Sequence, residues 1–175
     1  MKKIGQLLVL LGFCVNVTLK LVNLNVDSNE AHALLSLLLF AFTLVVVLGF
    51  VIVFFAEHKI INLVLAAGFV ASALMSLISF LMLTVDAFHL YDSVPYLRVF
   101  YVLTLLVWAF KFAKNTRFLL AIAVSCCAVI PLVQTGLYLQ FAFSQINSFV
   151  SFLSISACVL LVFVAFMEYK LSSDS

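Results

Sequence analysis

Long apolar runs alternate with short polar connections along the whole chain. An apolar run of about 18 or more residues predicts a membrane-spanning helix, because a hydrocarbon core of roughly 30 Å requires about 20 residues of helix. Six runs reach this length, at residues 4–26, 33–56, 60–85, 94–112, 118–140 and 146–167. The pattern predicts a single transmembrane helical domain over residues 1–175, in which helices adjacent in sequence pack antiparallel because their connections are short.

The first run is the least apolar of the six, because polar residues interrupt its second half. These residues are Asn16, Lys20, Asn23 and Asn25. A secretory signal peptide is the alternative, with Lys2 and Lys3 as its basic start and residues 4–15 as its apolar segment. No small-x-small cleavage site follows, and the polar residues recur at helical spacing, so the sequence favours a retained helix.

Composition supports the same class of protein. Hydrophobic residues make up 67% of the chain and charged residues 9%, with a mean hydropathy of +1.34. A soluble domain has about 45–50% apolar and about 25% charged residues. We therefore expect an all-α integral membrane protein, a six-helix bundle in contact with the lipid bilayer. The net charge is only +2 and no contiguous basic face is present, so we expect no binding of nucleic acid.

The basic residues predict an orientation by the positive-inside rule. With a cytoplasmic N-terminus, seven basic residues fall on the inner side and two, Lys20 and Arg98, on the outer side. The inner seven are Lys2, Lys3, Lys59, Lys111, Lys114, Arg117 and Lys170. Both termini are then cytoplasmic, and a multi-pass protein of the bacterial inner membrane is expected. Trp108 and Phe112 are expected to serve as interfacial anchors beside the basic cluster.

Polar residues inside the predicted spans are costly in a bilayer, so they indicate candidate sites. On the first helix, Asn16, Lys20, Asn23 and Asp27 follow the spacing i, i+4, i+7 and i+11, which predicts one common face. The candidates for a cavity or ligand site are Asn16, Lys20, Asn23, Asp27, Asp86, Arg98, Gln134, Tyr138, Asn147 and Ser151. Pro131 predicts a kink in the fifth helix, close to several of these residues.

Two interpretations of these polar residues remain open. In the first, they surround an outward-opening polar cavity, where Lys20 pairs with Asp27 or Asp86. In the second, Lys20 extends to the outer interface and the amides and hydroxyls form only interhelical hydrogen bonds. The small residues Gly68, Ser72 and Ser76 predict close helix packing, either within one chain or between the subunits of a homo-oligomer.

Motifs for catalysis or cofactor binding are missing from the sequence. There is no GxSxG motif, no CxxC pair, and no HExxH or other histidine spacing typical of zinc, so we expect no metal site and no cofactor. The chain carries four cysteines, which are expected to behave as small apolar residues. An enzyme is therefore not the favoured class.

Two functions follow as hypotheses. The first is a non-enzymatic polytopic membrane protein that acts through its helix faces on partner membrane proteins or lipids. The second is a small-molecule transport or substrate-binding subunit that uses the outer polar cavity. The direction of the Lys20 side chain discriminates between them, because an interior position favours a ligand and an interfacial position favours helix-face interaction.

Overall fold

The computed structural model describes the backbone of residues 1–26, 28–140 and 143–173, and the side chains of these ranges except 135–148 and 172–173. Within these ranges the chain forms helices and no strand, which confirms the predicted all-α class. The helices are α1 (Lys2–Asn23), α2 (Asn29–Glu57), α3 (Ile60–Val85), the short 3₁₀ helix η1 (Phe88–Ser93), α4 (Val94–Lys114), α5 (Phe118–Gln140) and α6 (Phe143–Ser173).

Five helical segments of the described chain are long and apolar enough to cross a membrane. Four of them lie in α1, α2, α3 and α6, and the fifth is η1 together with α4. In α5 the part with described side chains, 118–134, is apolar but shorter. The helices therefore have the length and composition of a multi-pass membrane protein.

Capping residues and left-handed backbone conformations set several of the helix boundaries. The α1 helix ends at Asn23 rather than at residue 26, and α2 begins at Asn29 rather than at residue 33. The earlier start of α2 follows from its N-cap, since the Ser28 hydroxyl accepts a hydrogen bond of 3.2 Å from the backbone N–H of Ala31. At their other ends, α2 and α3 stop at His58 and Asp86, which adopt left-handed backbone conformations with φ of 54° and 51°.

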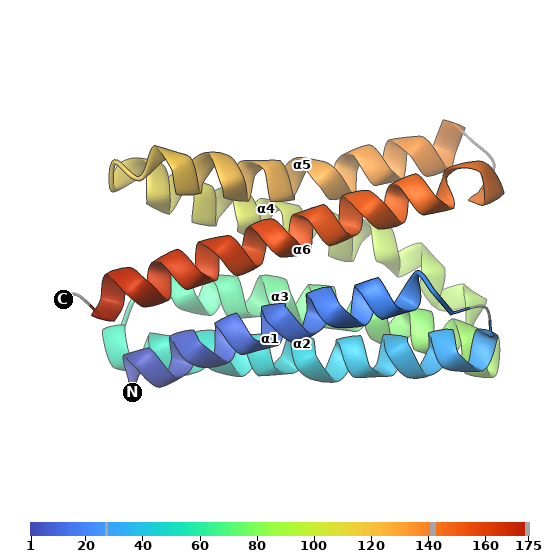
Figure 1. The fold of residues 1–175 in the computed structure, drawn as a ribbon, viewed down its shortest axis with the longest axis horizontal. Coiled ribbons are helices and arrows are strands. Elements are labelled where there is room, and N and C mark those ends of the chain that lie inside the picture. Colours follow the sequence, from blue (N-terminus) through green and yellow to red (C-terminus); the bar gives the residue numbers. More distant parts are fainter. Residues whose placement is uncertain (27, 141–142, 174–175) are drawn as a thin grey trace.

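The six long helices form a closed ring in chain order. Each packs against the helices that precede and follow it, and α6 closes the ring by packing against α1. In the described part of the chain, helices on opposite sides of the ring have no Cα atoms within 8 Å of each other. Only side chains therefore fill the axis of the ring. Both termini lie at one end of the bundle, with the α2–α3 and α4–α5 turns (Figure 1). The α3–α4 connection and the C-terminal ends of α1 and α5 lie at the opposite end.

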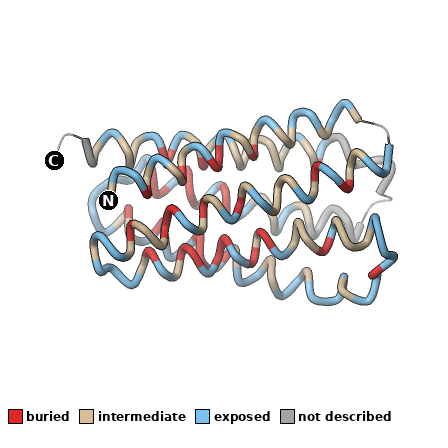
Figure 2. Tube along the Cα trace, turned by 90° about the horizontal axis from the view of Figure 1, so that it is seen from below, coloured by how far each residue is buried: buried red, intermediate tan, exposed pale blue. Residues whose placement is uncertain are grey.

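Aromatic side chains make up much of the core. Phe13, Phe50, Phe69, Trp108 and Phe112 are buried and contact one another through their rings. Buried positions cluster in the interior of the bundle, and exposed positions cover its outside (Figure 2). The expectation that Trp108 and Phe112 anchor the protein at the interface is wrong. Both side chains point inward, where they are 0% and 1% exposed, because the axis of the ring needs large side chains to fill it.

Glycines permit the close approach of α1 and α2. A methyl group on Gly49 would lie 2.6 Å from the Gly5 carbonyl oxygen and 2.7 Å from the Val9 side chain. Gly49→Ala is therefore expected to push the two helices apart and to lower the free energy of unfolding by about 1–3 kcal/mol, as overpacking does elsewhere. Unfolding by SDS, followed by circular dichroism in mixed micelles, measures the loss. Ala41→Val adds bulk on an exposed position of the same helix and should leave stability nearly unchanged; equal losses in both variants would contradict the assigned contact.

Candidate functional site

Two cavities lie inside the ring at different heights. One, named the distal cavity, lies in the half of the bundle away from the termini and has a volume of about 170 Å³. The other, named the terminal cavity, lies at the end where both termini are found and has a volume of about 260 Å³. All six long helices contribute to the lining of the distal cavity. The terminal cavity is lined by five of them and by the α4–α5 turn, so both cavities sit on or near the axis of the ring.

Polar and apolar side chains both line the distal cavity. Its polar and thiol-bearing lining residues are Asn16, Lys20, Thr43, Ser72, Ser76, Arg98, Tyr101, Cys127, Gln134, Ser154 and Cys158. Apolar residues, among them Phe13, Phe69 and Leu161, complete the wall. A few polar groups set in an apolar wall are typical of small-molecule sites.

Lys20 points into the distal cavity. Its Nζ donates a hydrogen bond to the Ser154 hydroxyl on the neighbouring helix α6. Lys20 forms no ion pair among the described residues, and of the two acids expected as partners, Asp86 is exposed at the end of α3 and Asp27 lies outside the described residues. The side chain stays inside because Ser154, an uncharged partner at its own depth, is within reach.

Asn16 leaves an unsatisfied acceptor at the same site. Its amide nitrogen donates to the Thr43 hydroxyl at 3.3 Å, and that hydroxyl donates in turn to the Leu39 carbonyl at 2.7 Å. This chain fixes the orientation of the amide, because Thr43 has already used its hydrogen and can only accept from Asn16. Asn16 is 7% exposed, and its Oδ1 atom is buried without a hydrogen-bond partner in the described structure. Such a group costs about 1–3 kcal/mol.

Basic residues outnumber acidic residues in the described lining of the distal cavity. Lys20 and Arg98 line it, and none of its described lining residues is Asp or Glu. Arg98 also has an interaction partner of its own. Lys20 has the uncharged Ser154 hydroxyl as its hydrogen-bond partner and forms no ion pair among the described residues.

The structure brings part of the predicted site set together. Asn16, Lys20, Arg98 and Gln134 line the distal cavity, and the Gln134 amide also donates to the Val150 carbonyl at 2.9 Å. Three other candidates with described side chains, Asn23, Asp86 and Ser151, are not among its lining residues. The side chains of Asp27, Tyr138 and Asn147 lie outside the described residues.

Asn23 is the last residue of α1 and does not line the distal cavity. Its Oδ1 lies 2.7 Å from Nδ1 of His32, in the first turns of α2. The contact joins α1 to α2 beside their connection, so the predicted polar face divides into an inner part, Asn16 and Lys20, and an outer part that holds the turn.

The three small residues of α3 that were predicted to pack helices have two different positions. A methyl group on Gly68 would lie 2.3 Å from the Thr104 side chain, so Gly68 allows α3 and α4 of one chain to pack closely. Ser72 and Ser76, which sequence spacing grouped with it for packing, line the distal cavity.

Thr43 and Tyr101 line the distal cavity although the sequence did not single them out. The sequence could have identified Thr43, because it is the one hydroxyl residue between Ser36 and Glu57 in a long apolar run. A hydroxyl at such a depth needs a partner, and in the structure it receives one from Asn16.

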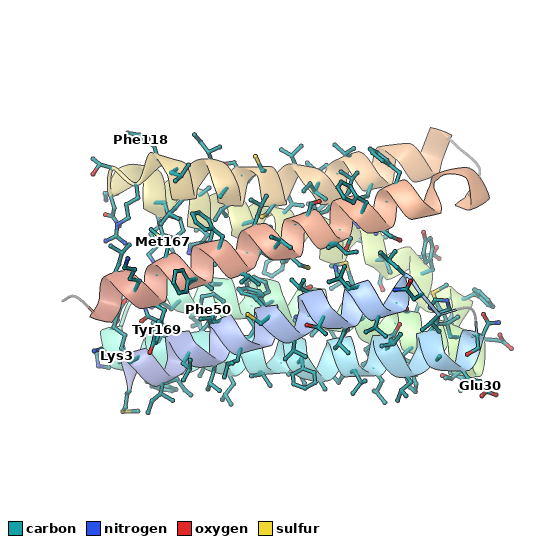
Figure 3. All side chains as sticks on the ribbon, viewed as in Figure 1. Lys3, Glu30, Phe50, Phe118, Met167 and Tyr169 are labelled. Atoms are coloured by element: carbon teal, nitrogen blue, oxygen red, sulfur yellow. The ribbon has the colours of Figure 1, made fainter. Side chains whose placement is uncertain are left out.

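The terminal cavity is rich in charge. Four basic residues and two acidic residues line it: Lys2, Lys59, Lys111, Arg117, Glu57 and Glu168. Ion pairs join Lys2 to Glu57 at 2.7 Å, Lys59 to Glu57 at 3.4 Å, and Lys111 to Glu168 at 3.1 Å. The charged end of the bundle is visible in Figure 3, where Lys3 and Tyr169 mark the same end. From sequence these charges predicted only the orientation of the chain.

Aromatic rings are part of the buried core between the two cavities. Phe50 lines the terminal cavity, and Phe13 and Phe69 line the distal cavity. The Phe50 and Phe69 rings stack with centroids 5.5 Å apart and an interplanar angle of 12°. Trp108 packs edge-on against both, at 5.6 Å from Phe50 and 6.4 Å from Phe69. Phe13, Phe50, Phe69 and Trp108 are hereafter called the aromatic barrier.

Comparison of the chain with protein-family models, with curated proteins and with solved structures gives no match in any of the three. The class of the protein therefore follows from its own features: an all-α bundle with several helices apolar enough to span a membrane. The two cavities and the aromatic barrier together make up its candidate functional site.

Proposed function

We propose that the chain is a six-span protein of a cell membrane, the bacterial inner membrane, with both termini in the cytoplasm, and that its distal cavity binds a small organic anion from outside. The excess of basic residues at the end of the bundle with the termini supports this orientation. The observation that carries the binding proposal is the interior position of Lys20, which donates to Ser154 inside the ring.

The chemistry of the distal cavity defines the class of ligand. Lys20 and Arg98, with no acid in the described lining, favour an anionic group. The unpartnered Asn16 Oδ1 favours a ligand that also carries a hydrogen-bond donor. A volume of about 170 Å³ is small beside the roughly 300–1,000 Å³ of sites for drug-sized ligands. A short hydroxycarboxylate, with a carboxylate for the cations and a hydroxyl for Asn16, meets these conditions.

The helix-face hypothesis lacks an observation of this kind. Large exposed apolar residues cover the outside of the bundle, but any multi-pass protein needs such residues against lipid. They therefore do not favour a partner protein over the bilayer itself. A stoichiometric partner that copurifies with the chain, together with no response to anions, would support this hypothesis.

A thermal-shift experiment tests the binding proposal. Lactate, a hydroxycarboxylate, is expected to stabilise the purified protein in detergent, by about 2.7 kcal/mol at 100 times its Kd. Propionate, which lacks the hydroxyl, should stabilise it less, because it cannot donate to Asn16. Lys20→Met should lose most of the effect of lactate. Lys114→Met removes the same charge from an exposed position that lines neither cavity and should keep it. A shift of equal size in Lys20→Met, or no shift in the wild type, would overturn the proposal.

A further inference from the structure

We propose that the two cavities are the two ends of one passage for small anions along the axis of the ring, and that the aromatic barrier closes it. The inference rests on the proposed function, since it needs the ring to span the membrane with the distal cavity outside. It goes further than binding, because it assigns transport to the protein. It also makes the terminal cavity the inner end of the passage and the four aromatic residues its closure.

The ring architecture makes such a passage possible. Backbones on opposite sides of the ring stay more than 8 Å apart at Cα in the described chain, so only side chains block the axis. Rotation of side chains can therefore open the axis without separation of the helices.

A pair of aromatic rings connects the linings of the two cavities. Phe50 belongs to the lining of one cavity and Phe69 to the lining of the other, and their rings are in direct contact. Buried aliphatic residues, among them Leu65 and Leu105, belong to the same core cluster as these rings. Apolar constrictions of this kind close channels by excluding water.

Both cavities have more basic than acidic residues in their described linings. The distal cavity has two basic and no acidic residues in its described lining, and the terminal cavity has four basic and two acidic. Rings of Arg and Lys select anions in membrane pores. An anion that leaves one cavity therefore enters another with a favourable potential, and cations are disfavoured at both ends.

Trp108 adds an independent observation within the barrier. Its indole N–H is buried and has no hydrogen-bond partner in the described structure. Buried Trp N–H groups usually have a partner. Water or a passing anion on the axis would accept a hydrogen bond from this N–H. The Trp108 N–H is therefore unsatisfied when the barrier is closed and can be satisfied when the passage is open.

Transport into proteoliposomes tests the inference, with radiolabelled lactate as the probe at pH 8, where almost none of it is protonated. Phe50→Ala and Phe69→Ala are expected to raise the initial rate of uptake at least tenfold over the wild type. Phe55→Ala, on the outer face of the same helix as Phe50 and 60% exposed, should leave the rate unchanged. Lys20→Met combined with Phe50→Ala should lower the rate again, because the distal cavity then attracts anions less.

The two proposals fail in different ways. Because alanine in the barrier can prevent folding, Phe50→Leu is measured alongside, and each variant is first checked for stabilisation by lactate. Folded, lactate-stabilised barrier variants with the wild-type rate would overturn the passage and leave the binding proposal intact. The same rise in Phe55→Ala would mean a non-specific leak and would also overturn the passage. If lactate does not stabilise the wild-type protein, the binding proposal is overturned.

Discussion

Replacement of Trp108 by alanine is expected to lower the free energy of unfolding by about 3–5 kcal/mol, the cost of truncating a large buried aromatic side chain. Trp108 is 0% exposed and contacts Phe50, Phe69 and Phe112 through its rings, with centroid distances of 5.6, 6.4 and 5.8 Å. Its truncation therefore removes the contacts to all of these rings at once.

The architecture explains why this loss cannot be recovered by relaxation. Helices in a membrane gain little from leaving lipid for protein, so packing contacts supply much of the stability of a bundle. Trp108 fills the axis of a ring whose opposite helices do not approach within 8 Å at Cα in the described chain. A collapse of the ring onto the void would require several helices to move together, so the void is expected to persist with its full cost.

Equilibrium unfolding by SDS, with tertiary structure followed by near-ultraviolet circular dichroism, measures the effect. Phe110→Ala is the matched control, since Phe110 lies on the same helix and is 70% exposed on the outer face. Its truncation should change stability by less than about 0.5 kcal/mol, as expected for a surface position. A loss as large in Phe110→Ala as in Trp108→Ala, or a negligible loss in both, would contradict the interior position of Trp108.

The same tryptophan shows where prediction of the fold from sequence stops. Hydrophobic length predicted a helix in each of six ranges, because spanning a bilayer requires a nearly fixed number of residues, and a helix lies over each range. Composition could not tell lipid-facing from axial positions, since a side chain suited to lipid is also suited to a core. Trp108 and Phe112 were thus placed at the interface, although both are buried. Closure of the ring by α1 and α6 also had no signal in the chain.

Part of the candidate site could be predicted from sequence, because polar residues inside a membrane span are costly and therefore stand out. Asn16 and Lys20 stood out because i and i+4 share a helix face, and both line the distal cavity. Asn23 continued the same pattern but serves the α1–α2 connection through His32. The terminal cavity could not be foreseen. Its charges lie at helix ends, where basic residues are expected for topology alone, so the pairing of Lys2 with Glu57 carried no signal in one sequence.

Cys158 provides the second large expected effect, because it lines the distal cavity and so reports on which side of the membrane that cavity is reached. In a variant with Cys14, Cys126 and Cys127 replaced by alanine, Cys158 should react with a membrane-impermeant methanethiosulfonate reagent added to right-side-out vesicles. The same reagent added to inverted vesicles should react on the order of a hundredfold more slowly, since the aromatic barrier lies between the terminal cavity and Cys158.

The charge of the reagent provides the control for this experiment. Lys20 and Arg98 share the cavity with Cys158, so an anionic sulfonatoethyl reagent should react about tenfold faster than a cationic trimethylammonium reagent of similar size. Lys20→Met should reduce this preference, and Lys114→Met should not. Labelling from inverted vesicles alone would show that the orientation is reversed and that the distal cavity faces the cytoplasm. Equal rates for both reagents from the outer side would mean that the cavity does not select anions, and would remove the basis for a carboxylate ligand.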